Sequence, residues 1–192
     1  MSLKLHDHVL SAECYSVRLT LSLLGLAWER VAVDAYPGNA RAPVLFDDGL
    51  VLDDPGLILT HLARVHGPQW LPQEEATEIA GWLAFGVTAL APLAEARRVA
   101  VFGAQGDLTT LNRKGRDALR TIEDTLLLRG IAGDAWLVGA QPSIADLATF
   151  PHVVLSHDSG IGHEDYPAIN LWQRRVRKLP GFVGMPGIPD YF

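Results

Sequence analysis

The order of strand-like and helix-like segments divides this chain of 192 residues into two unlike parts. Residues 1–67 alternate between the two kinds of segment, whereas residues 74–192 carry only helical patterns. Residues 68–73, which include two prolines, are the predicted linker. This segregation predicts an α+β protein, in which a small α/β domain precedes an all-helical domain.

The first part begins with a strand, a helix and a second strand. Leu3–Leu10 is short and β-compatible, and the helix that Ser11 opens ends at Gly25. Trp28–Val33 alternates apolar and polar residues, as a half-buried strand does. Two strands joined through a helix in this way favour a parallel pair.

A hairpin and another helix complete the first part. Pro43–Phe46 and Leu50–Leu52 are apolar runs separated by Asp47–Gly49, and Asp-Gly between apolar runs is a strong hairpin signal. A hairpin is antiparallel, so the sheet must contain strands of mixed direction. Asp54 and Pro55 then open a helix, because proline suits the first helical turn and an acid suits the positive end of the helix dipole.

The second part contains amphipathic runs that predict helices. The first run has an interior proline, Pro92, and we expect a bend there because proline removes a backbone hydrogen bond. Ser143 and Asp146 resemble a helix capping box, with Asp in place of the usual Glu or Gln. The predicted helical runs are Glu74–Ala100, Leu108–Leu128, Leu147–Leu155 and Pro167–Lys178.

Charge and cysteine content narrow the class of protein. A net charge of −6, from 16 basic and 22 acidic residues, argues against binding to nucleic acid or an anionic membrane. One cysteine, Cys14, forms no intrachain disulfide or cysteine-rich zinc site and fits a reducing compartment. No segment has the apolar core of a signal peptide or the roughly 20 apolar residues of a membrane helix. We therefore expect a soluble, cytoplasmic protein without a metal site.

Five short segments, taken in order, resemble the glutathione S-transferase family. They are Ser11–Arg18 (SAECYSVR), Ala42–Leu45 (APVL), Gly49–Asp54 (GLVLDD), Trp136–Asp146 (WLVGAQPSIAD) and Tyr166–Phe182. The resemblance implies a thioredoxin-like N-terminal domain over residues 1–67 and an all-α C-terminal domain over residues 74–192. It also implies a homodimer that takes glutathione as co-substrate and needs no metal or redox cofactor.

Ser11 is the predicted catalytic residue. It lies at a strand-to-helix junction, where a hydroxyl can donate a hydrogen bond to a bound thiolate and lower the pKa of the thiol. In serine-using members of the family, the matching residue does this for glutathione. The alternative is that Ser11 only caps the helix.

Cys14 lies three residues after Ser11, in the first helical turn. A Ser-x-x-Cys sequence cannot close an internal disulfide, which argues against a thiol–disulfide oxidoreductase. The thiol either has a pKa lowered by the helix N-terminus and lines the substrate site, or is buried and inert.

Further candidates for substrate binding surround Pro43. By resemblance, Pro43 is the family's cis-proline, and the backbone of Ala42 pairs with the cysteinyl part of glutathione. The alternative is a trans-proline at the start of an edge strand. Arg41, the basic residue of the preceding loop, could reach a carboxylate. Candidates for the co-substrate side are Tyr15, Arg97, Arg98 and Phe102.

Two features depart from the family pattern. The family has an acid followed by Ser or Thr where this chain has Asp54-Pro55, and Pro55 offers neither a hydroxyl nor an N–H to the γ-glutamyl carboxylate. Only nine residues, Asp34–Ala42, separate the second strand from Pro43. We therefore expect the second helix of the thioredoxin-like domain to be reduced or missing.

Two functions are compatible with these residues. In the first, Ser11 holds glutathione as a thiolate beside a small hydrophobic electrophile, and the two are conjugated. In the second, the chain is a degenerate binding or scaffold protein that has lost normal glutathione binding. Ser11, Pro43 and Asp54 favour the enzyme, whereas Pro55 and the shortened loop favour the binding protein.

Overall fold

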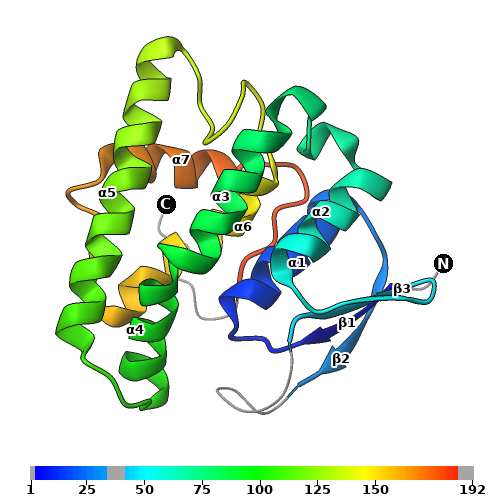
Figure 1. Cartoon of the computed structure of the whole chain (residues 1–192), viewed down its shortest axis with the longest axis horizontal. Helices are drawn as coiled ribbons and strands as arrows, with labels where there is room; N and C mark the ends of the chain where they lie inside the picture. The colour runs from blue at the N-terminus through cyan, green and yellow to red at the C-terminus, as the bar shows by residue number, and fades with distance from the viewer. Residues whose placement is uncertain (1–2, 34–41, 186–192) are drawn as a thin grey trace.

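A small sheet and a larger group of helices make up the two halves of the protein (Figure 1). The computed structural model describes residues 3–33 and 42–185. The sheet lies on one side of the molecule, two helices cover the face that looks inward, and the remaining helices form the other side. The α+β organisation predicted from the sequence is confirmed. The domain boundaries at residues 67 and 74 stay predictions.

The sheet has four strands of mixed direction. β1 (Leu3–Asp7) pairs parallel with β2 (Trp28–Ala32) and antiparallel with β3 (Val44–Asp47), which pairs antiparallel with β4 (Leu50–Leu52). The resulting order is β2-β1-β3-β4. β1 is therefore central, and its residue Leu5 is completely buried. The predicted parallel pair and hairpin are both confirmed.

The hairpin turn shows why an Asp-Gly pair predicts this structure. Asp48 has a φ of 47° and Gly49 a φ of 91°, so both lie in the left-handed region. That conformation matches the twist of the flanking strands in a two-residue hairpin loop. Glycine adopts it freely, and aspartate tolerates it better than most residues. The turn places Asp47 opposite Leu50 and so sets the register of the hairpin.

Two helices from the first half pack between the sheet and the helical half. They are α1 (Ala12–Leu23) and α2 (Pro55–His66), and both contact each other and α6 (Ile144–Val154). The helix expected at Asp54-Pro55 is thus confirmed. The predicted reduction or loss of the thioredoxin-like domain's second helix concerns residues 34–41, which lie outside the described residues.

The run predicted as one bent helix is two separate helices. α3 (Ala76–Thr88) and α4 (Ala91–Phe102) are separated by Ala89 and Leu90, and Pro92 lies in the first turn of α4. The missing N–H of a proline is harmless there, because the first N–H groups of a helix have no intrahelical acceptor. Pro92 therefore begins a helix instead of bending one. The remaining elements are η1 (Pro68–Trp70), η2 (Gln73–Glu75), α5 (Leu108–Ala132), η3 (Leu155–Ser159) and α7 (Pro167–Arg177).

One buried carboxylate holds the centre of the helical half together. Asp146 is fully buried in α6 and accepts hydrogen bonds from the backbone N–H of Ser143 at 2.9 Å and of Leu137 at 3.1 Å. It also accepts one from the indole N–H of Trp172 in α7 at 2.8 Å. The Ser143–Asp146 capping box predicted from the sequence is confirmed. The same side chain thus joins α6 to α7 and to the preceding loop.

Two polar connections fasten the halves to each other at the two ends of α1. Arg97 in α4 donates to the carbonyl of Leu10, directly before α1, and pairs with Asp158 at 2.6 Å. At the other end, Ser22 donates to the carbonyl of Gly181 at 2.7 Å. The C-terminal segment therefore returns to the first helix of the chain.

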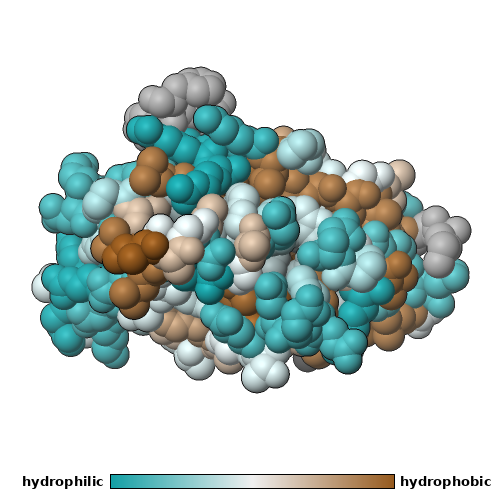
Figure 2. Space-filling view, turned by 90° about the horizontal axis from the view of Figure 1, so that it is seen from above, coloured by the Kyte–Doolittle hydropathy of each residue, from teal (hydrophilic) through white to brown (hydrophobic). Residues whose placement is uncertain are grey.

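An apolar stretch in the second half lies largely at the surface. Residues 68–102 are long and apolar enough to cross a membrane by composition, the one such stretch found in the described ranges, and 22% of the most apolar window is buried. The structure divides this stretch among η1, η2, α3 and α4. Ile79 is the sole buried residue of α3. Trp82, Leu83 and Phe85 of α3 are partly buried against the core, whereas Val87 is 62% exposed, and apolar patches interrupt the hydrophilic surface that Figure 2 shows.

Removing the Asp146 carboxylate should destabilise the protein severely. Asp146→Ala leaves three buried N–H donors without acceptors, at roughly 1–3 kcal/mol each, and we expect the free energy of unfolding to fall by about 4 kcal/mol. Urea unfolding followed by circular dichroism measures the change. Asp124→Ala, at an exposed position of α5, is the control and should change stability by less than about 0.5 kcal/mol. A loss below about 1 kcal/mol in Asp146→Ala would contradict the assigned role.

Stability should also depend on the protonation of His163, which is 3% exposed. Its ring nitrogens lie 2.7 Å from Ser156 Oγ and 2.9 Å from Gln173 Nε2, and its ring lies at a tilt of 43° to that of His157. Burial, followed by repulsion from His157, lowers the pKa of His163 from 6.5 to about 4. Below pH 6.5 the unfolded chain binds a proton that the folded chain does not, so stability falls as pH drops from 6.5 towards 4.

When the pH falls from about 7 to about 5, His163 alone should lower the free energy of unfolding by about 2 kcal/mol. Urea unfolding at both pH values, in the wild type and in His163→Asn, measures this contribution. The variant should lose less stability on acidification than the wild type. Equal losses in the two proteins would show that His163 is not responsible.

Candidate functional site

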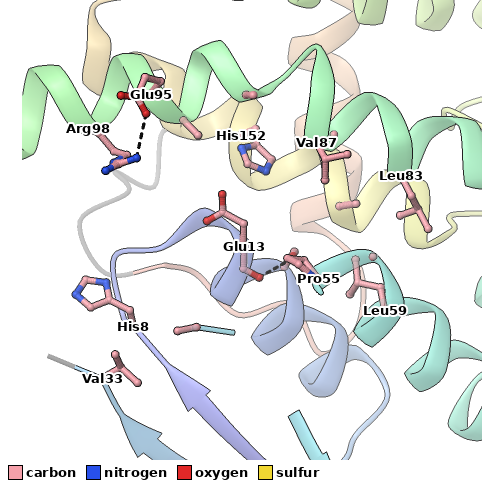
Figure 3. Close-up of a pocket in the computed structure, with 17 residues that line it drawn as sticks. His8, Glu13, Val33, Pro55, Leu59, Leu83, Val87, Glu95, Arg98 and His152 are labelled. Carbon is pink, nitrogen blue, oxygen red and sulfur yellow. Dashed lines mark hydrogen bonds and ion pairs between the residues drawn. The ribbon is translucent and has the colours of Figure 1, made fainter. Parts of the chain in front are cut away.

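A cavity of about 480 Å³ lies where the two halves meet. The first half contributes the loop after β1, the first turns of α1, residue Ala42 and the N-terminus of α2. The helical half contributes the end of α3, the inner side of α4 and part of α6. Figure 3 shows this arrangement, with Glu13 and His8 on one side and His152, Glu95 and Arg98 on the other. The volume lies in the range of small-molecule sites.

Ser11 does not line this cavity, although its hydrogen-bond partner Glu13 does. The residue is 1% exposed, and its Oγ accepts a hydrogen bond from the backbone N–H of Cys14 at 3.1 Å, which caps α1. The same hydroxyl donates to Glu13 Oε2 at 2.8 Å. A hydroxyl has one hydrogen to donate, so in this arrangement the hydrogen of Ser11 points to Glu13. The capping role considered from the sequence is present.

Glu13 and His152 are two ionisable residues of the cavity wall that influence each other's pKa, and the sequence analysis did not single them out. Burial alone would raise the pKa of Glu13, but attraction to His152 and hydrogen bonds, including that from Ser11, outweigh burial and hold the pKa below its usual value. Burial lowers the pKa of His152 against the attraction of Glu13. At neutral pH the pair is therefore a carboxylate beside a neutral imidazole.

His8 and Cys14 lie close together behind the first turn of α1. The backbone N–H of His8 lies 3.4 Å from Cys14 Sγ, and His8 Nδ1 accepts a hydrogen bond from the N–H of Leu10 at 3.2 Å. Burial raises the pKa of the Cys14 thiol to about 11, and the side chain is fully buried. Cys14 therefore fits the buried, inert alternative, and it does not line the cavity.

The predicted cis peptide bond is present between Ala42 and Pro43. Ala42 lines the cavity, while Pro43 is buried beside it. Arg41 lies outside the described residues, so its predicted part in binding is not described.

The N-terminus of α2 reaches the cavity through Pro55 and Gly56. Asp54 accepts a hydrogen bond from the N–H of Leu57 at 2.8 Å and caps the helix. Pro55 has no N–H, and the N–H of Gly56 lies too near the start of the helix to have an intrahelical acceptor. Gly56 therefore offers the one backbone donor of this terminus that a ligand in the cavity can use.

The four candidates for the co-substrate side divide between structural and cavity positions. Arg98 lines the cavity and pairs with Glu95 at 3.1 Å. Arg97 is 6% exposed and holds the two halves together, with its guanidinium over the ring of Phe102. Tyr15 is 1% exposed and donates from its hydroxyl to the carbonyl of Val183 at 2.8 Å. Arg98 is thus the one of the four that lines this cavity.

No group of three or more His, Cys, Asp or Glu side chains arranged to hold a metal ion occurs within residues 3–33 and 42–185. The histidines that the sequence spreads along the chain take separate roles instead. His61 pairs with Asp47 at 2.8 Å, His163 is buried between η3 and α7, and His152 lines the cavity.

Comparison with known proteins identifies the fold. No protein-family model matches the sequence, and no curated protein matches it. Among solved structures, a glutathione S-transferase from Xanthobacter autotrophicus Py2 has a TM-score of 0.83 and 29% identity, covering 96% of this chain and 97% of that chain. A possible glutathione S-transferase from Rhodopseudomonas palustris has a TM-score of 0.85 and 26% identity, covering 97% and 99%. Yeast Ure2p in complex with glutathione has a TM-score of 0.83 and 24% identity, covering 93% and 95%.

The fold and the cavity therefore define a two-part protein with a thioredoxin-like α/β unit and an all-helical unit, and a ligand-sized cavity between them. The chain is a glutathione S-transferase-like protein.

Proposed function

We propose that the chain binds glutathione in the cavity and conjugates its thiol to a small hydrophobic electrophile. The observation that carries the proposal is the cavity itself, which the N-termini of α1 and α2 border together with Ala42. Helix N-termini favour anionic groups, and glutathione carries carboxylates and, when ionised, a thiolate. Ure2p and a glutathione transferase homolog from Lodderomyces elongisporus, both with this fold, are described as complexes with glutathione.

In this proposal the tripeptide lies along the wall that the first half provides. Its cysteinyl backbone pairs with Ala42, and its γ-glutamyl carboxylate accepts a hydrogen bond from the N–H of Gly56 at the start of α2. Pro55 removes one donor that the family usually supplies there. We therefore expect weaker binding than in a site with both donors.

The opposite wall supplies the place for the electrophile. It is mainly apolar and contains Leu83 and Val87 of α3 with Ala91 and Ala94 of α4. Apolar walls with a few polar groups suit a small hydrophobic compound. Conjugation then consists of holding such a compound beside a thiolate, which Ser11 stabilises once its hydroxyl has turned from Glu13 to the sulfur.

A non-catalytic function is the second candidate, and a specific observation favours it. The hydroxyl of Ser11 already donates to Glu13, and the Glu13 carboxylate repels a thiolate placed beside it. One neighbour with this fold is the nitrogen regulation fragment of the yeast prion protein Ure2p. In this alternative the chain keeps the fold as a binding protein and does not conjugate glutathione.

Two measurements separate the candidate functions. The first is calorimetry with glutathione at neutral pH, and the second is a turnover assay with a panel of electrophiles. The enzyme should bind glutathione with a dissociation constant between about 1 μM and a few mM. Ser11→Ala should reduce turnover by about tenfold to a hundredfold, because a hydrogen bond to an anion contributes roughly 1.5–3 kcal/mol. Thr109→Ala, which removes a hydroxyl at an exposed position of α5 away from the cavity, is the control.

Binding without turnover would support the non-catalytic alternative, and no binding would refute the glutathione proposal. If Ser11→Ala lowers the free energy of unfolding but leaves turnover unchanged, Ser11 serves only as the cap of α1.

We also propose that the chain forms a homodimer through exposed apolar residues of α2, β4 and α3. Leu57 in α2 is 59% exposed, Val51 in β4 54% and Val87 in α3 62%. α2 and α3 adjoin here, because a Cβ built on Gly56 would lie 3.9 Å from the Cβ of Leu83. Large apolar side chains exposed on adjoining elements favour an interaction site.

Leu57→Asp should convert the dimer to a monomer, because a charge buried without a partner at the interface is strongly unfavourable. Sedimentation velocity measures the mass. Ile131→Asp, at the far end of α5 where the side chain is 85% exposed, introduces the same charge away from the proposed surface and should stay dimeric. A monomeric wild type, or dimeric Leu57→Asp, would refute this interface.

A further inference from the structure

An imidazole and a carboxylate from two different helices line the same cavity. His152 comes from α6 and Glu13 from the first turn of α1, and Figure 3 shows the two side chains pointing toward the same space. Nδ1 of His152 is buried and has no hydrogen-bond partner among the described residues. Buried polar atoms nearly always have a partner, so the unpaired Nδ1 marks this imidazole as unusual, and the residue itself lines the ligand-sized cavity.

The charges around this pair determine what the imidazole can do. Glu13 attracts a proton on His152, whereas burial disfavours it, so the ring is neutral when the cavity holds no ligand. His8, Glu95 and Arg98 line the same cavity, and Arg97 acts on Glu13 from α4. Arg98 is paired with Glu95, and the guanidinium of Arg97 is committed to Leu10 and Asp158. Glu13 is therefore the acid that acts directly on His152.

We propose that His152 is the base that ionises the bound thiol and that Glu13 stabilises the imidazolium produced. The proposal rests on the glutathione binding proposed above. The S–H bond of the thiol breaks, its proton moves to the unprotonated nitrogen of the neutral imidazole, and the electron pair stays on sulfur. The products are a thiolate and an imidazolium, and the carboxylate of Glu13 neutralises the latter.

This assignment gives Ser11 and Glu13 consistent roles. In the absence of ligand, Glu13 accepts the hydroxyl hydrogen of Ser11 at 2.8 Å, so the hydroxyl is not available to a thiolate. When His152 becomes positively charged, its charge offsets that of the carboxylate and weakens the need for the hydroxyl hydrogen bond. The hydroxyl of Ser11 is then free to turn and donate to the new thiolate. A base on α6 therefore explains how a carboxylate beside the thiol site is compatible with thiolate formation.

The test is the titration of bound glutathione, followed by the ultraviolet absorbance of its thiolate, in the wild type, His152→Gln and Glu13→Gln. His152→Gln removes the proton acceptor and should raise the apparent pKa of the bound thiol by about 1–2 units. Glu13→Gln should raise it by about one unit, because the imidazolium loses its counter-charge. His6→Gln is the matched control, since His6 lies on β1 against Phe46 and does not line the cavity.

Binding of S-methylglutathione separates this proposal from the proposed function, because the analogue has no thiol proton. We expect the wild type and His152→Gln to bind it equally, which also shows that the variant is folded. If both proteins bind glutathione and its thiol titrates identically in both, His152 is not the base, although glutathione binding stands. If the wild type binds neither compound, glutathione binding is refuted and the assignment of His152 with it.

Discussion

The buried carboxylate of Asp146 determines where the helical half stands relative to the cavity. Three N–H groups converge on it, from the loop before α6, from the N-terminus of α6 and from Trp172 of α7. A buried anion is tolerable only when such donors replace its water, so the three segments cannot separate without a large cost. α6 in turn contacts α1, α2 and α3 and carries His152. The position of one side of the cavity therefore depends on a hydrogen-bond group well away from it.

Much of the fold could be predicted from the sequence because its signals are local. The Asp48-Gly49 turn, the Asp54 cap and the Ser143–Asp146 box each depend on residues within three positions of one another. The break between α3 and α4 was missed because Ala89 and Leu90 favour helix as strongly as their neighbours do. There, tertiary packing decided the boundary, with Leu90 completely buried.

The candidate site was predicted less completely, for a related physical reason. Ala42 and Pro55 line the cavity as expected, and the Ala42–Pro43 bond is cis. Glu13 stood inside the segment that carried the family resemblance, yet its importance depends on His152, which lines the same cavity only because α1 packs against α6. No periodicity in either helix indicates such a pairing. One signal was nevertheless available in the sequence. Glu13 places a negative charge two residues after Ser11, at the helix start where a thiolate was expected to bind.

The attachments at the two ends of α1 have a mechanical consequence. Arg97 joins α4 to the carbonyl before the helix, and Ser22 and Tyr15 join the helix to the C-terminal segment. α1 is thus attached to the second half of the chain at both of its ends. The separation of the two cavity walls, and with it the thickness of a compound that fits between them, therefore depends on contacts at the ends of a helix and not only on the residues that line the cavity.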